Sequence, residues 1–152
     1  MVKVAFYIAK KGTIIDKIVS LFVRKYSHIE IYINGWCYSI SWRDKGGRAK
    51  KIDLNDGKWE SLELPTINKK QLRLFYQEYQ QVKDMPYDFL TLFINSFTEN
   101  DYDRSPDKTY CFKMIIHIIN IIYNKKIPIT LMGEDLYDKI KKEFNLKSCN
   151  FK

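Results

Sequence analysis

Cys111 is the residue of this chain whose type and position could do chemistry. It stands just before an apolar stretch, Met114 to Tyr123, that is typical of a buried helix, while Ser105 to Asp107 are typical of a loop and a helix start. A cysteine in the first turn of a helix lies near the positive end of the helix dipole, which favours its thiolate. Free cysteine is also a common small buried residue, so position alone leaves a structural role open.

Two histidines could activate this thiol. His117 is six residues beyond Cys111, about 240° around the same predicted helix, so the two side chains cannot meet, and we interpret His117 as a core or helix-surface residue. His28 lies in the stretch 27–33, where isoleucines alternate with other residues, so it should face away from the isoleucine row. If the cysteine helix packs against that face, His28 and Cys111 would form a thiolate–imidazolium pair. Otherwise His28 is an ordinary polar residue on a strand.

The surrounding pattern predicts the elements that would position this pair. Asn34-Gly35 is a strong hairpin signal between two predicted strands. Strands are predicted at 2–9, 27–33, 36–42, 48–54 and 59–64, and helices at 14–22, 68–82, 89–97, 111–123 and 133–144. We therefore expect an α+β fold in which a small antiparallel β-sheet packs against helices and the cysteine helix comes late in the chain.

Composition limits the domain count and the partners. With 45% hydrophobic and 15% aromatic residues, the 152 residues can form one core, and we expect a single domain over 1–152 with a frayed tail at about 145–152. The net charge is +8, but the densest basic stretches, Arg43 to Lys51 and Lys139 to Lys142, are short and are interrupted or flanked by acidic residues. We interpret most of this charge as a solvated surface with a weak preference for an anionic membrane surface, and we do not expect nucleic acid as a partner.

Cysteine usage and hydropathy predict the compartment. Cys37, Cys111 and Cys149 are an odd number with no regular spacing and no CxxC pair, so we expect a reducing compartment, no disulfide framework and no structural zinc. No other pattern calls for a metal or a cofactor. The N-terminal residues lack the long apolar core of a secretory signal, and no apolar run reaches the roughly 18 residues of a membrane span. We expect a cytoplasmic protein, in the host cytoplasm if it is viral.

Three motifs, taken in order, resemble those of a known family. Ser27-His28-Ile29-Glu30-Ile31-Tyr32 is followed by Met85-Pro86-Tyr87-Asp88 and then by Tyr110-Cys111-Phe112-Lys113-Met114-Ile115. With the histidine strand first and the cysteine helix last, the chain resembles the circularly permuted branch of the NlpC-type papain-like cysteine hydrolases. That branch includes the bacterial YiiX and YaeF groups, relatives of lecithin-retinol acyltransferase, and short phage and poxvirus proteins. The resemblance covers the chain from Val2 to Phe144, and its specificity comes from the order and spacing of the motifs.

The resemblance implies roles for individual residues. Cys111 would be the nucleophile and His28 the general base. Family members often carry a Glu or His on the strand after the histidine strand, where this chain has Ser39 and Ser41. Glu30 is the substitute on the face of His28, about 7 Å along the strand, a spacing over which a hydrogen bond needs leaning side chains. Ser39 and Glu30 are therefore both predicted to take part in catalysis.

The function that the resemblance implies is acyl transfer through a thioester. The substrate would be an amide, ester or thioester of a lipid, a peptidoglycan peptide or a protein, and we predict that Lys113, Tyr32 and Tyr110 bind it. As an alternative, Lys113 is a solvated lysine.

Two other functions stay open at this point. A catalytically weak or inactive binding module on the same fold would hold an anionic lipid, nucleic acid or protein partner through Arg43 to Lys51, and the missing carboxylate favours it. Thiol redox chemistry would need a resolving cysteine near Cys111, such as Cys37.

Overall fold

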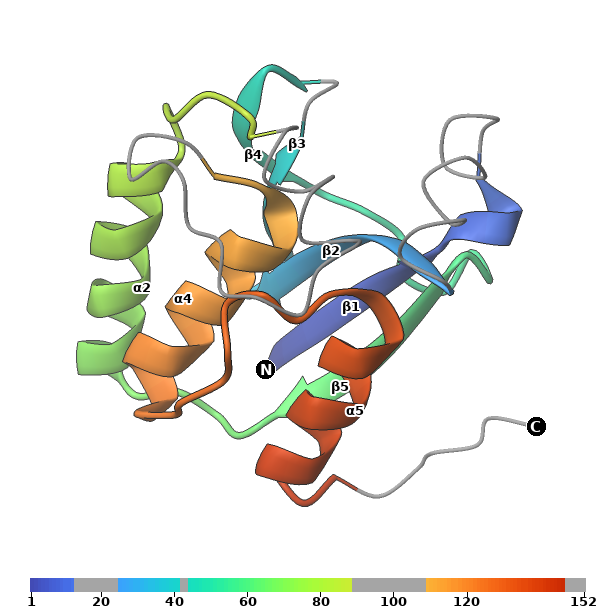
Figure 1. Cartoon of the computed structure of the whole chain (residues 1–152). Coiled ribbons are helices and arrows are strands. Elements are labelled where there is room, and N and C mark those ends of the chain that lie inside the picture. Colours follow the sequence, from blue (N-terminus) through green and yellow to red (C-terminus); the bar gives the residue numbers. More distant parts are fainter. Residues whose placement is uncertain (13–24, 42–43, 89–108, 147–152) are drawn as a thin grey trace.

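A five-stranded antiparallel sheet organises the protein (Figure 1), whose computed structural model describes residues 1–12, 25–41, 44–88 and 109–146. The strand order is β4-β3-β2-β1-β5. The strands are β1 (Val2–Ile8), β2 (Tyr26–Ile33), β3 (Trp36–Ser41), β4 (Gly46–Lys50) and β5 (Trp59–Leu64). The helices of the described part are the 3-10 turn η1 (Ala9–Lys11) and the α-helices α2 (Lys69–Val82), α4 (Cys111–Tyr123) and α5 (Gly133–Glu143). The predicted α+β class is confirmed.

Local sequence explains several ends of these elements. Asn34 and Gly35 have φ angles of 51° and 90°, which a two-residue hairpin between β2 and β3 requires. α2 begins with a capping box, in which the side chains of Asn68 and Gln71 each accept a hydrogen bond from the backbone N–H of the other. α4 ends at Tyr123 and is followed by Asn124, which adopts the left-handed conformation common after a helix.

The predicted strand 48–54 is wrong in extent. β4 covers Gly46–Lys50 and forms one edge of the sheet, and the chain then crosses to the opposite edge, where β5 pairs with β1. The reason is burial: Leu62 and Leu64 of β5 pair with Val4 and Val2 and enter the core on the same face.

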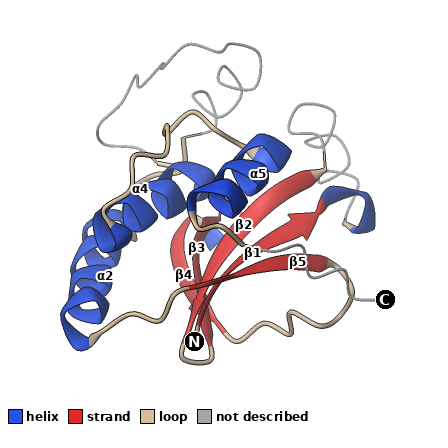
Figure 2. Cartoon of the chain, turned by 90° about the horizontal axis from the view of Figure 1, so that it is seen from below, coloured by secondary structure: helices blue, strands red, loops and turns tan. Residues whose placement is uncertain are grey.

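The core lies on one face of the sheet. Ile29, Ile31 and Ile33 are buried in a cluster with the apolar side chains of α4, and Figure 2 shows α2, α4 and α5 on one side of the strands. The alternation predicted for β2 is therefore confirmed. The sequence analysis expected His28 and Cys111 to meet if the cysteine helix packed against the face of His28. That condition is wrong, because α4 packs against the isoleucine face.

A β-bulge at the start of β2 brings His28 close to the helix all the same. The pairing of β1 with β2 shifts register between Tyr7 and Ile8, and Tyr26 and Ile29 both enter the core although they are three residues apart. A bulge bends its strand and re-aims the side chains beside it, and bulges are frequent next to active sites. His28 lies within this irregular stretch.

Several predictions fall outside the described residues: the helices at 14–22 and 89–97 and most of the tail at 145–152. The helix at 133–144 is confirmed as α5 to within one residue. None of the helices within the described ranges is long and apolar enough to cross a membrane.

Candidate active site

Cys111 is the first residue of α4, and only 1% of it is exposed. The residue before it, Tyr110, is extended and gives the helix no side-chain cap. The first backbone N–H groups of a helix have no partner inside it. Those at the start of α4 can therefore donate to an oxygen atom bound near the Cys111 Sγ.

His28 forms a hydrogen bond with Cys111. Burial by itself would lower the pKa of His28, but the charge and hydrogen bond of Cys111, followed by those of Glu30, raise that pKa to about 10. The imidazole is therefore protonated at neutral pH when it lies against a thiolate. The structure thus brings together the cysteine and the histidine that the sequence singled out.

Glu30 is the third member of this chain of contacts. Its carboxylate is fully buried, and its Oε1 lies 2.9 Å from the His28 Nε2. The side chains lean toward each other over the spacing of two residues along β2, as the sequence analysis required. A carboxylate in this place orients the imidazole and stabilises the imidazolium.

Ser39 does not orient the imidazole, so the prediction that it shares this role is wrong. Its hydroxyl donates to the Ile29 carbonyl at 2.7 Å. Ser41 forms a hydrogen bond with Asp44 instead. Both serines are thus bonded elsewhere, and the carboxylate comes from the histidine's own strand.

Arg48 is a site residue that the sequence analysis missed. Its Nη2 is paired with the Glu30 Oε1 and lies 3.3 Å from the His28 Nε2, and its Nη1 is 3.1 Å from the Asp44 Oδ2. Arg48 pairs with Ser39 in the sheet, so its side chain spans β3 to reach β2. The small serine leaves room for that reach. Only the strand order and register could have indicated this contact.

Tyr87 is a second missed residue. A parallel bridge joins Tyr87 to Thr109, with Asp88 N donating to Thr109 O at 2.9 Å and Thr109 N donating to Pro86 O at 3.2 Å. The Tyr87 hydroxyl forms a hydrogen bond with Cys111. Burial first, and Cys111 next, hold the pKa of Tyr87 well above its ordinary value, so the hydroxyl keeps its proton and can donate it in a hydrogen bond.

The predicted substrate-binding residues have different positions. Tyr110 is fully buried in the core and its hydroxyl reaches the Ile129 carbonyl at 3.5 Å, so its ring offers no surface to a substrate and that prediction is wrong. Tyr32 is partly buried on β2, and Lys113 is partly buried in the first turn of α4. A binding role for these two stays a prediction.

Two aromatic rings lie beside His28. Tyr7 on β1 pairs with both His28 and Trp59 of the neighbouring strands, so the three side chains form one row across the sheet. The ring centroids of Tyr7 and Trp59 are 5.0 Å apart, and those of His28 and Trp59 are 6.5 Å apart. Both aromatic residues are partly exposed. This row offers an apolar surface next to the imidazole.

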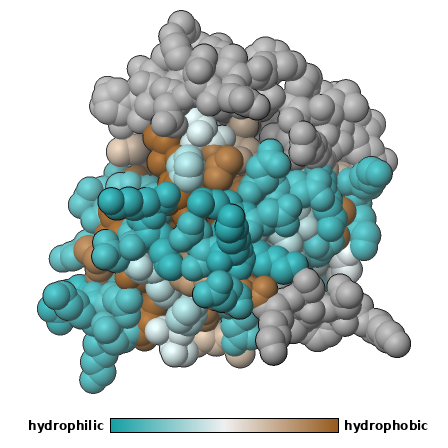
Figure 3. All heavy atoms as spheres, turned by 60° about the horizontal axis from the view of Figure 1, so that its bottom comes forward, coloured by the Kyte–Doolittle hydropathy of each residue, from teal (hydrophilic) through white to brown (hydrophobic). Residues whose placement is uncertain are grey.

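His117 and, in the described part of the basic stretch, Lys50 and Lys51 have partners outside the chain of contacts around Cys111. His117 is exposed on α4 and bonds Glu78 at 3.0 Å, as expected for a helix-surface histidine. In the basic stretch, Lys50 pairs with Asp44, and Lys51 lies over the ring of Trp36. Figure 3 shows mainly hydrophilic side chains on the described part of one face.

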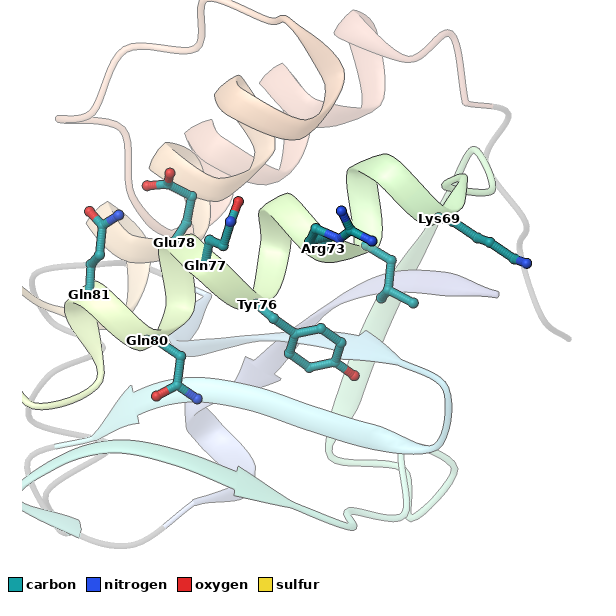
Figure 4. A pocket seen from close by; sticks show the side chains of 8 residues that line it. Lys69, Arg73, Tyr76, Gln77, Glu78, Gln80 and Gln81 are labelled. Atoms are coloured by element: carbon teal, nitrogen blue, oxygen red, sulfur yellow. The ribbon is translucent and has the colours of Figure 1, made fainter.

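An open hollow of about 850 Å³ runs along α2 (Figure 4). All its lining residues belong to that single helix, among them Arg73, Tyr76 and Gln80, and none contributes to the Cys111 site. A surface along one helix has no converging polar groups of the kind a small-molecule site needs. We therefore assign it no part in the chemistry.

Comparison with protein-family models, curated proteins and solved structures finds no match to this chain. Within the described part of the chain, no three His, Cys, Asp or Glu side chains are grouped to hold a metal ion. The chemistry of the site therefore has to be argued from Cys111, His28, Glu30, Arg48 and Tyr87.

Proposed function

We propose that this protein is a cysteine-dependent hydrolase or acyltransferase that acts on an amide, ester or thioester through a thioester acyl-enzyme. The observation that carries the proposal is the continuous chain of contacts from Cys111 through His28 to the buried carboxylate of Glu30. A nucleophile, a base in contact with it and a third group that orients the base are the parts from which activated cysteine nucleophiles are built.

We also propose that the fold is the permuted NlpC-type papain-like arrangement. Its support is the order of the elements: the histidine lies on the second strand, the cysteine begins a later helix, and a Pro-Tyr-Asp segment lies beside that helix start. These are the motifs on which the sequence resemblance rests. The described sheet and helices are consistent with such a domain.

In the first half of the reaction, the Cys111 thiolate attacks the carbonyl carbon of the substrate while the proton resides on His28. The carbonyl π electrons move to the oxygen, and the backbone N–H groups at the start of α4 and the Tyr87 hydroxyl donate hydrogen bonds to the resulting oxyanion. When the intermediate collapses, the bond to the leaving amine, alcohol or thiol breaks, and His28 gives that group its proton.

In the second half, His28 takes a proton from water or from an acceptor amine or alcohol. The activated nucleophile attacks the thioester, the bond between carbon and Sγ breaks, and the Cys111 thiolate is restored with an imidazolium beside it. Glu30 stabilises that imidazolium in both halves, because its Oε1 stays on Nε2. Water as the acceptor gives hydrolysis, and an amine or alcohol gives acyl transfer.

The substrate class that suits the site is an acyl, peptide or lipid carbonyl compound. Tyr7 and Trp59 provide an apolar surface beside the imidazole, against which an acyl chain or a side chain of the substrate can pack. The net charge of +8 favours an anionic membrane surface or substrate. A reducing, cytoplasmic environment would suit a thiolate nucleophile.

The two alternative functions lose support from the described contacts. The binding module was favoured by the apparent lack of a carboxylate near His28, a place that Glu30 fills. Thiol redox chemistry needs a reactive second cysteine, but burial first, and the charge of Glu30 next, raise the pKa of Cys37 to about 12. A thiol in that state is a poor partner for disulfide exchange.

The proposal is tested by the rate at which iodoacetamide alkylates Cys111 across pH 4 to 10, measured by mass spectrometry. Because an ordinary thiol titrates near pKa ~8.5, we expect Cys111 to react well below that pH, with Cys37 and Cys149 as internal controls. His28→Ala should abolish the reaction at low pH, whereas His117→Ala, which removes the other histidine, should leave it unchanged.

A second measurement tests turnover. An activated ester such as p-nitrophenyl butyrate should leave a butyryl group on Cys111 that is released more slowly in His28→Ala. A Cys111 thiol that reacts only at high pH, with the same profile in His28→Ala, would contradict the proposed function and leave a binding module on this fold.

A further inference from the structure

Arg48 joins the buried Glu30 to the surface of the molecule. Its guanidinium contacts both Glu30 and His28, and it is held from the other side by Asp44. The carboxylate of Glu30 is fully buried, while 19% of the Arg48 side chain is exposed. An ionised carboxylate without an opposite charge at such a depth would take up a proton.

The backbone around Arg48 fixes where the guanidinium lies. Gly47 N donates to the Lys83 carbonyl at 2.6 Å, which ties β4 to the end of α2. Asp44 is itself held by Lys50. The position of Arg48 is thus held by its strand, by the contact of that strand with the end of α2, and by Asp44.

Among the four groups in the chain of contacts from Cys111 through His28 and Glu30 to Arg48, the charges balance only when Arg48 is counted. The Cys111 thiolate and the Glu30 carboxylate carry two negative charges, and the His28 imidazolium and Arg48 carry two positive ones. Among the described residues, the other titratable or charged groups around this set are Tyr7, Cys37, Asp44, Lys50, Tyr79, Tyr87, Asp88 and Tyr110. Burial keeps Cys37, Tyr79 and Tyr87 neutral, Asp44 and Lys50 offset each other, and Asp88 lies next to Tyr87, outside this chain of contacts.

We propose that Arg48 is a positioning residue of this site, which keeps Glu30 ionised and directed at His28 and so maintains the thiolate–imidazolium pair. This inference rests on the proposed function. Without Arg48 the buried set would have one excess negative charge, which a proton on Glu30 or on the thiolate would remove, and either change weakens the thiolate–imidazolium pair. Arg48 therefore acts on Cys111 through Glu30 and His28, and it does not contact the reacting atoms.

Opposite substitutions in the Arg48–Glu30 pair provide the test. The measured quantity is the midpoint of the acid limb in the pH profile of Cys111 alkylation. Arg48→Met should raise this midpoint by about one pH unit or more, since a nearby charge shifts a pKa by about 1–3 units. Glu30→Gln should lower it, because Arg48 is then unpaired and favours the thiolate over the thiol, while the plateau rate should fall because the imidazolium loses the carboxylate that stabilises it. The double variant should return close to the wild-type midpoint, because its charges balance again.

Arg48→Lys separates charge from geometry. Lysine keeps the positive charge but has no planar fork, so the midpoint should stay near that of the wild type while the plateau rate falls. If Arg48→Met does not fold, Arg48→Gln, which also removes the charge, replaces it, because Arg48 can act through Glu30 only while the Glu30 carboxylate is present. Circular dichroism checks the fold of each variant.

The outcomes distinguish this inference from the proposed function. A wild-type Cys111 that lacks low-pH reactivity overturns both. A wild-type Cys111 with low-pH reactivity that depends on His28 supports the function. In that case Arg48 is a merely structural residue if Arg48→Met leaves the midpoint unchanged, or if both single variants move it in the same direction.

Discussion

Gly47 lies where β4 meets the end of α2, and replacing it with alanine should destabilise the protein. A Cβ added at this position would lie 2.5 Å from the Lys83 Cα and 2.7 Å from the Lys83 carbonyl oxygen. These atoms belong to backbone, so they cannot move aside as a flexible side chain could. The same carbonyl accepts the hydrogen bond from Gly47 N at 2.6 Å, so separating the two segments would also strain that bond.

The size of the effect follows from these two terms. Forcing an extra carbon into a tightly packed place costs about 1–3 kcal/mol. Losing one backbone hydrogen bond costs about 0.5–1.5 kcal/mol, so the free energy of unfolding should fall by about 2–4 kcal/mol. At about 2–4 °C per kcal/mol for a chain of this length, the melting temperature should fall by roughly 5–15 °C.

Urea denaturation followed by circular dichroism measures the loss. Gly57→Ala is the matched control, because Gly57 has a φ of +77° but no atom within 4 Å of an added Cβ, so it isolates backbone strain of about 1–2 kcal/mol. Because Gly47 precedes Arg48, the same variant should also shift the acid limb of Cys111 alkylation upward. If Gly47→Ala unfolds no more easily than Gly57→Ala, the contact between β4 and α2 is not as tight as these distances indicate.

Three further outcomes are expected. Asn68→Ala should lower the free energy of unfolding by about 1 kcal/mol, measured in urea, because it breaks the capping box with Gln71; an unchanged value would mean that the cap contributes nothing. Ile116→Ala in the fully buried face of α4 should cost about 2–5 kcal/mol, and a loss below 1 kcal/mol would place this residue outside the core. Burial works to raise the pKa of Asp44, but Lys50 and Arg48 outweigh it and lower that pKa, so its stabilising effect is present above pH ~4 and is lost as the pH falls through the lowered pKa. Asp44→Asn should make the decline of stability below pH ~4 shallower, and an identical slope would contradict the pairing.

Most of the fold could be predicted because its signals are local. The alternation in 27–33, the Asn34-Gly35 turn and the apolar run after Cys111 each depend on neighbouring residues. The strand, the turn and the helix that these three signals predict are all present. The place of β5 could not be predicted in this way. Its pairing with β1 at the far edge of the sheet depends on where Leu62 and Leu64 can be buried. That depends on residues far apart in the sequence, which local patterns do not indicate.

In the candidate site, too, the sequence predicted only the residues whose signals are local. Cys111 and His28 were found from residue type and position, and Glu30 from the period of a strand. Tyr87 was missed as a donor because a bridge to Thr109, far along the chain, sets its position. Arg48 was missed because the sequence analysis treated its segment as solvated surface or as a binding surface for a partner, whereas the register places this one arginine opposite Ser39.

Burial of the thiol explains why this site would need a second charge pair. With only 1% of Cys111 exposed, water cannot stabilise a thiolate there, and an isolated thiolate–imidazolium pair would revert to its neutral form by returning the proton. Glu30 opposes that return by stabilising the imidazolium, but its own buried charge is tolerable only beside Arg48. Each charge in this chain thus depends on the next, from the core to the partly exposed guanidinium. A substitution at any of the four positions should therefore be judged by the net charge that it leaves behind as well as by the contact that it removes.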